Sequence, residues 1–138
     1  MEKIYCDTCI YLDYFYKRKT ERGRDVGKEA LIVFNSVLKG QYKLVVSNWV
    51  LEELKFYNCE EFQNLEKFLS NNMIYIKYSD QDMIKAKKFN NWKDALHVIL
   101  AEKTGSDYLI TQNIQDFILF DTKIKLIQPS YLFFLEDL

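Results

Sequence analysis

Short β-rich runs alternate with helical patterns along the chain. Five runs rich in branched and aromatic residues predict strands at Lys3 to Cys6, Tyr42 to Ser47, Met73 to Lys77, Asp107 to Thr111 and Lys123 to Ile127. The spacing of apolar positions predicts helices at Thr8 to Lys17, Val26 to Lys39, Asn48 to Tyr57, Glu60 to Leu69, Asp80 to Phe89 and Lys93 to Thr104, with a last short helix after Pro129. Strands that alternate with helices predict right-handed crossovers and a parallel α/β sheet covered on both faces.

The length and composition fit one domain of this class. The chain has 138 residues, of which 49% are hydrophobic and 28% charged, so it is long enough and apolar enough to bury a core. Only 4 glycines and 1 proline are present, which argues against a turn-rich β-sandwich. Because no repeat or linker interrupts the pattern, we predict a single domain over residues 1–138.

Charge and cysteine content limit the partners and the compartment. The formal net charge is −1, so nucleic acid contacts must come from a local basic patch or a bound metal. Three cysteines are an odd and sparse set, typical of reduced thiols. No secretory signal and no apolar run of membrane-spanning length are visible, so we expect a cytoplasmic protein without a membrane partner.

Acidic residues follow several of the predicted strands. These residues are Asp7, Glu52, Glu53, Asp94 and Asp116, with Asn113 beside the last. In an open parallel sheet, ligands gather beyond the carboxyl ends of the strands, where these side chains are expected. Any one of them alone is better explained as a surface residue or a helix cap. Together they predict a site for a hard cation, because clustered carboxylates repel one another unless a cation neutralises them.

Four sequence segments resemble PIN-domain nucleases over nearly the whole chain. They read IYCDTCIYLDYF, SNWVLEEL, KDALHVILAEKTGSDYLITQNIQDF and QPSYLFFLEDL, and the third is the most specific. The resemblance implies a PIN-like three-layer α/β fold. Its parallel sheet would have four to five strands in the order 3-2-1-4-5, with helices on both faces.

The same resemblance implies which residues act. The family's catalytic and metal-binding acids carry over onto Asp7, Glu53, Asp94 and Asp116, with Mg²⁺ or Mn²⁺ as the cofactor. Many relatives have Asp where this chain has Asn113, so Asn113 is expected to be a neutral ligand or substrate contact, as is Thr111.

The implied activity is metal-dependent hydrolysis of RNA phosphodiester bonds by an endoribonuclease. The chain has one histidine, His97, which cannot supply both the acid and the base of a histidine-based ribonuclease. We expect His97 to pack or hydrogen-bond within the helix layer rather than to bind metal.

In its short, single-domain form the sequence resembles VapC-like toxins of toxin–antitoxin pairs. This resemblance implies a small antitoxin protein as a partner. Two alternatives remain open: a PIN nuclease of RNA maturation or decay without an antitoxin, and a degenerate module that binds RNA or protein without cutting.

Two surface features suggest further contacts. A basic segment follows the helix that begins beside Asp7, and RNA phosphates are the predicted ligands of Lys17, Arg18, Lys19, Arg22 and Arg24. A solvated charged loop explains that segment equally well.

Aromatic residues crowd the same helix at Tyr11, Tyr14, Phe15 and Tyr16. This predicts a homodimer interface unless they pack beneath the basic segment.

Three other kinds of site are disfavoured. The Cys6-Asp7-Thr8-Cys9 run lacks the preceding Trp and a suitably placed proline of a thioredoxin-like redox pair, and zinc needs more ligands. The Gly23 to Glu29 segment is one residue short of a phosphate-binding loop and follows no strand. A receiver domain would need two adjacent acids after the first strand, where Asp7 stands alone.

Overall fold

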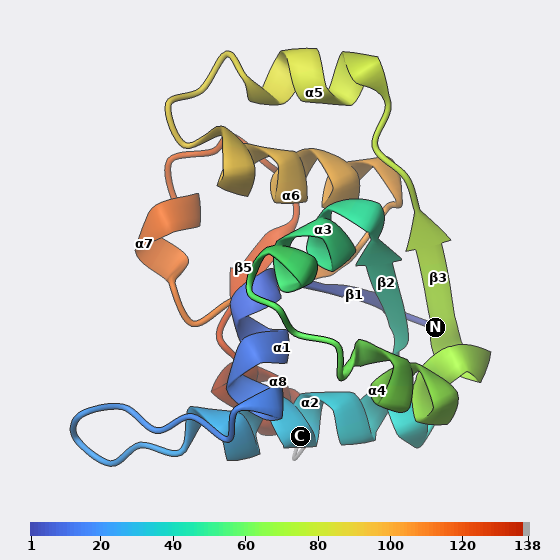
Figure 1. Ribbon diagram of the computed structural model, residues 1–138, viewed down its shortest axis with the longest axis vertical. Helices are drawn as coiled ribbons and strands as arrows, with labels where there is room; N and C mark the ends of the chain where they lie inside the picture. Colours follow the sequence, from blue (N-terminus) through green and yellow to red (C-terminus); the bar gives the residue numbers. More distant parts are fainter. Residues whose placement is uncertain (137–138) are drawn as a thin grey trace.

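The central feature of the fold is a five-stranded parallel sheet in the order β3-β2-β1-β4-β5 (Figure 1). The structure is a computed structural model that describes residues 1–136. The strands are β1 (Lys3–Cys6), β2 (Lys43–Ser47), β3 (Met73–Ile76), β4 (Tyr108–Ile110) and β5 (Lys125–Ile127). All four pairings are parallel, so the class and the strand order expected from the sequence are confirmed.

Helices cover both faces of this sheet. They are α1 (Thr8–Phe15), α2 (Val26–Leu38), α3 (Asn48–Phe56), α4 (Phe62–Leu69), α5 (Asp80–Ala86), α6 (Trp92–Lys103), α7 (Ile114–Phe117) and α8 (Pro129–Glu136). Helices α1, α2, α4 and α8 form one group, while α5, α6 and α7 form another on the opposite side (Figure 1). Helix α3 lies at the carboxyl end of β2 and contacts α1.

The first strand occupies the middle of the sheet, and its burial explains its sequence. Ile4, Tyr5 and Cys6 are completely buried, as are Leu44 and Val45 on the neighbouring strand. A strand covered by helices on both faces needs apolar side chains on both, which is why these runs do not alternate with polar residues. Asp7 is the first polar residue after β1, so it marks the edge of the core.

Two elements were not predicted, and both are very short. A 3₁₀ turn covers Ser70–Asn72, and α7 spans only four residues, Ile114–Phe117. Neither is long enough to show a helical stripe of apolar positions. Their absence from the prediction leaves the topology unaffected, but α7 carries Asp116 and therefore matters for the site.

Most of the aromatic side chains of α1 are used inside the molecule. Tyr11 is completely buried, and the rings of Tyr14 and Phe34 meet edge to face with centroids 5.3 Å apart. Phe15 is half-buried, while Tyr16 keeps 46% of its surface exposed. The homodimer stays a prediction, but the aromatic content of α1 is largely accounted for by packing within one chain.

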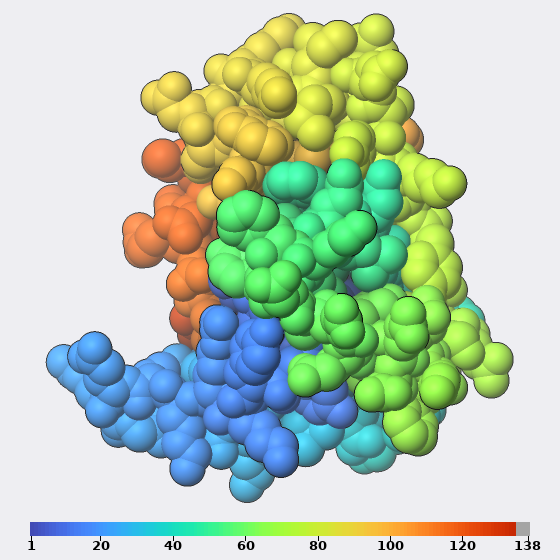
Figure 2. Space-filling model, viewed as in Figure 1, coloured from blue at the N-terminus to red at the C-terminus, as the bar shows by residue number. Residues whose placement is uncertain are grey.

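Helices α1 and α2 approach each other at Gly27, where no side chain would fit. A Cβ atom there would lie 2.7 Å from the Asp13 carbonyl oxygen and 2.9 Å from the Lys17 Cα atom. The Gly27 N–H donates to the Arg18 carbonyl at 3.0 Å, which joins the two ends of the basic segment. Residues 17–24 therefore leave and re-enter the fold at one point, and they protrude from the body of the molecule (Figure 2).

None of the helices within residues 1–136 combines the length and the apolar character that a membrane span needs. Cys6, Cys9 and Cys59 are all free thiols.

Candidate active site

A cleft of about 370 Å³ lies at the carboxyl end of the sheet. Four elements deliver acidic side chains to it: the end of β1, α3, α6 and α7. The acids that line it are Asp7, Glu53, Asp94 and Asp116, and Asn113 lines it as well. Thr111 lies below it, completely buried. The neighbouring Glu52 is exposed outside the cleft and accepts a hydrogen bond from the Tyr78 hydroxyl at 2.9 Å.

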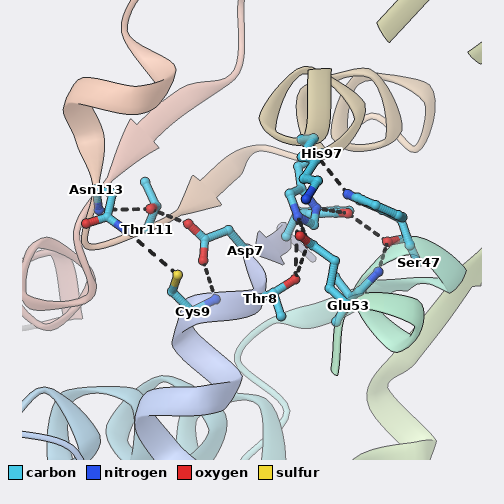
Figure 3. A network of polar contacts seen from close by, with 12 residues as sticks. Asp7, Thr8, Cys9, Ser47, Glu53, His97, Thr111 and Asn113 are labelled. Carbon is cyan, nitrogen blue, oxygen red and sulfur yellow. Dashed lines mark hydrogen bonds and ion pairs between the residues drawn. The ribbon is translucent and has the colours of Figure 1, made fainter. Parts of the chain in front are cut away.

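Asp7 is fixed by the start of α1 and by β4. It caps α1, because its Oδ1 accepts a hydrogen bond from the Cys9 N–H at 2.7 Å. Its Oδ2 accepts a short hydrogen bond from the Thr111 hydroxyl (Figure 3). The carboxyl is only 4% exposed, and burial raises its pKa, although the Thr111 hydrogen bond opposes that rise.

Glu53 is held by a chain of buried polar side chains. His97 Nε2 lies 2.6 Å from Glu53 Oε1, and the Thr8 hydroxyl donates to the same oxygen at 2.7 Å (Figure 3). The Tyr5 hydroxyl bonds both His97 Nδ1 and the Ser47 hydroxyl, each at 2.7 Å. His97 thus hydrogen-bonds within the helix layer, with Glu53 as one partner.

The environment of Glu53 favours its ionised form. Burial would raise its pKa, but the hydrogen bond and charge of His97, the Thr8 hydroxyl and the Lys93 charge together lower it. Glu53 is therefore a carboxylate in the metal-free protein at neutral pH.

The environment of Asp94, in contrast, favours its protonated form. Burial raises its pKa to about 6, and the negative charges of Asp7, Asp116 and Glu53 add to the rise, against a lowering by His97. The three other acids are thus close enough to repel Asp94. Asp116 itself is exposed on α7, and its backbone carbonyl accepts a hydrogen bond from the Asn91 amide at 3.3 Å.

Asn113 and Thr111 connect β4 to the opening of the cleft. The Asn113 N–H donates to the Thr111 hydroxyl oxygen at 2.9 Å, while that hydroxyl donates to Asp7. The Asn113 side-chain amide reaches Cys9 Sγ at 3.7 Å (Figure 3). Thr111 therefore positions Asp7, and Asn113 presents a neutral amide at the edge of the cleft.

The donor set suits a hard divalent cation, although the acids are not drawn together. Among residues 1–136, no three His, Cys, Asp or Glu side chains converge into a ready metal-binding group. Mg²⁺ keeps several water ligands and is commonly bound through one or two carboxylates, so it does not need such a group. Asp7, Glu53, Asp94 and Asp116 supply the oxygen donors that it prefers.

Several lining residues escaped the sequence prediction. Tyr57, Trp92 and Lys93 border the cleft, and Thr8 binds Glu53. Trp92 and Lys93 directly precede Asp94. The predicted helix start that places Asp94 at the site therefore places these two residues beside it.

The basic segment lies elsewhere. It begins beyond the end of α1, an eight-residue helix, which places it about 12 Å along the helix from Asp7. None of Lys17, Arg18, Lys19, Arg22 and Arg24 lines the cleft. Arg24 forms an ion pair with Glu29 at 2.6 Å, and Arg18 lies 3.7 Å from Asp13.

Comparison with known proteins supports the fold. No protein-family model and no curated protein matches the sequence. The chain is similar to a chain in the crystal structure of VapBC2 from Rickettsia felis bound to a DNA fragment from their promoter. The TM-score is 0.54 at 15% sequence identity, and the match covers 91% of this chain and 97% of that one. At this identity the likeness establishes the shared fold, which is consistent with the PIN-like architecture.

Proposed function

We propose that this protein is a metal-dependent endoribonuclease that hydrolyses RNA phosphodiester bonds and acts as the toxin of a toxin–antitoxin pair. One observation carries the proposal: four carboxylates from four separate elements line a single cleft at the carboxyl end of a PIN-like sheet. Ligands of open α/β sheets bind in this position. Acids placed only as surface residues or helix caps have no reason to gather four at a time around one cleft.

The acids would hold Mg²⁺ or Mn²⁺, with Asp7, Glu53, Asp94 and Asp116 as the candidate ligands. A bound divalent cation supplies an activated water and neutralises charge on the phosphate. The protein's own contribution is orientation. Thr111 and the Cys9 N–H fix both oxygens of Asp7, and His97 and Thr8 fix one oxygen of Glu53.

The protonation states also suit cation binding. Glu53 is held as a carboxylate by His97, while burial, together with repulsion from the neighbouring acids, raises the pKa of Asp94 to about 6. A cation that approaches Asp94 relieves that repulsion, so ionised Asp94 gains most from its arrival. Asn113 adds an amide oxygen donor or a contact to the substrate without adding charge.

A small antitoxin protein is part of this proposal. One similar solved structure is that of VapBC2 bound to a DNA fragment from their promoter. A small reading frame directly upstream of this one would favour the toxin assignment over a nuclease of RNA maturation or decay. The free cysteines suit the reducing cytoplasm in which such a pair would act.

The test is Asp94→Asn, examined by thermal melting with and without Mn²⁺ and by RNA cleavage. We expect the variant to lose metal-dependent cleavage. Mn²⁺ should raise the Tm of the unaltered protein by mass action and have little effect on the variant. A helix cap would tolerate Asn and keep both properties.

Asp80→Asn is the matched control, because Asp80 also lies in the first turn of a helix but belongs to α5, outside the cleft. It should behave as the unaltered protein does. Equal metal responses in the Asp94 variant and the unaltered protein would overturn the metal site. Metal binding and RNA binding without cleavage in the unaltered protein would favour the non-cutting module instead.

A further inference from the structure

We propose that Phe56 and Trp92, at the border of the cleft, are the rings on which bases of the RNA strand stack, with Lys93 between these two rings as the phosphate contact. We call these three residues the stacking border. The inference rests on the proposed function, since it names the side chains that would hold the RNA strand beside the acids. Its test measures binding without metal, so it can fail independently of cleavage.

Phe56 is a large apolar side chain exposed to solvent near the cleft. It keeps 80% of its surface in contact with solvent at the end of α3. It follows Glu53 by three residues, which puts the ring and the carboxyl on adjoining parts of one helix face. Tyr57 comes next, lines the cleft, and meets Phe56 edge to face with centroids 5.8 Å apart.

Trp92 is the second ring, and its neighbours hold it firmly. It begins α6, two residues before Asp94, and lines the cleft. The Trp49 ring lies behind it at a centroid distance of 5.5 Å, and Trp49 Nε1 donates to the Lys93 carbonyl at 3.1 Å. A ring held in this way loses little freedom when a base stacks on it.

Lys93 links the two rings. Its Nζ lies 6.0 Å from the Phe56 ring centroid and 5.9 Å from the Trp92 ring centroid. Its charge also reaches Glu53, whose pKa it helps to lower. Lys87 adds a second ammonium 5.2 Å from the Trp92 ring. The green end of α3 and the yellow-orange start of α6 meet on the surface in Figure 2.

This combination matches the chemistry of an unpaired nucleic acid strand. Bases present flat π-faces that stack on aromatic rings, and each phosphate presents a negative charge to an ammonium. In a duplex the base faces are already stacked on one another, so they cannot use the rings. The acidic floor of the cleft repels phosphates, which makes Lys93 and Lys87 the groups that draw the strand toward the acids.

The experiment measures binding of fluorescein-labelled oligouridylate by anisotropy, with chelator present to prevent cleavage. We expect Phe56→Leu and Trp92→Leu each to weaken binding about 5- to 150-fold, the range for loss of one stacked base. Lys93→Gln should reduce the slope of binding against salt. Phe56 is so exposed that its variant should fold normally.

Phe68→Leu is the matched control, because Phe68 is 70% exposed on α4, away from the cleft. It should leave RNA affinity unchanged. Intrinsic fluorescence gives a second readout: the chain has 2 tryptophans, and both belong to this cluster. Single-stranded RNA should quench their emission, whereas a duplex of the same length should not.

Unchanged affinity in Phe56→Leu would overturn the stacking border, as would equal quenching by duplex and single strand. If the rings are instead covered by a protein partner, Phe56→Leu binds RNA normally, which also overturns it. Asp94→Asn separates the two proposals, because it should bind the single strand at least as tightly as the unaltered protein while cutting nothing.

Discussion

Asp94 links the electrostatics of the cleft to the stability of the fold. Its pKa rises from the ordinary 3.8 to about 6, chiefly through burial and then through the charges of Asp7, Asp116 and Glu53. Between pH 4 and 6 the unfolded chain has released this proton while the folded protein still holds it. The free energy of unfolding therefore falls as pH rises through this window.

In the metal-free protein, Asp94→Asn should remove this fall in the free energy of unfolding with rising pH. Because the side chain is half-buried and solvent screens it, we expect a gain of about 1 kcal/mol at pH 7.5 and almost none at pH 4. Urea unfolding with chelator at the two pH values measures the difference. A gain that is the same at both pH values would show that ionisation of Asp94 does not cause it.

At the residue scale, the sequence predicted the positions of the acids better than those of the side chains that hold them by hydrogen bonds. Asp7, Glu53, Asp94 and Asp116 all line one cleft, because the carboxyl ends of parallel strands meet at one edge of the sheet. The chain of Tyr5, Ser47 and His97 was not foreseeable. Ser47 lies 42 positions from Tyr5 along the chain and His97 lies 92 positions from it. No local sequence pattern indicates contacts between residues so far apart.

At the element scale, prediction succeeded where apolar periodicity was strong. Strand β1 has the predicted bounds, and α2 ends one residue before its predicted end. The prediction extended α5 to Phe89, whereas the helix ends at Ala86. The residues after Ala86 are exposed, so no buried face continues the helix. Helix α7 was missed because four residues hold too little pattern.

The close approach of α1 and α2 gives a prediction at this scale. Gly27→Ala should lower the free energy of unfolding by about 2 kcal/mol or more, because the new methyl group would meet the backbone of Asp13 and Lys17. Lys28→Ala is the control, since Lys28 is exposed on the same turn and should change stability by less than about 0.5 kcal/mol. Chemical denaturation measures both. Equal stability of the two variants would contradict the tight contact.

At the scale of the whole molecule, the stacking border and the basic segment form two separate cationic regions. The basic segment begins about 12 Å along α1 from Asp7 and protrudes from the body (Figure 2). A strand bound at the stacking border must continue past α1 before it meets the basic segment. If the segment contributes to RNA binding, its contribution should therefore grow with the length of the RNA.

We expect a variant with Ser at the five predicted basic positions, which are Lys17, Arg18, Lys19, Arg22 and Arg24, to bind an oligonucleotide of roughly four residues normally. It should bind a strand of about 20 nucleotides more weakly and with a shallower salt dependence. Anisotropy titrations at several salt concentrations measure this. An unchanged salt slope with the long strand would mean that the segment is only a solvated loop.

The central position of β1 has a consequence for folding during synthesis of the protein. The hydroxyl that fixes Asp7 belongs to Thr111, which is synthesised 104 positions later. At roughly 5 to 20 residues per second, translation separates the two by about 5 to 20 seconds. Strand β4 cannot join the sheet before then, and neither Asp94 nor Asp116 can reach the cleft early. Under the proposed function, the cleft would therefore be assembled only after β4 and α7 have been synthesised.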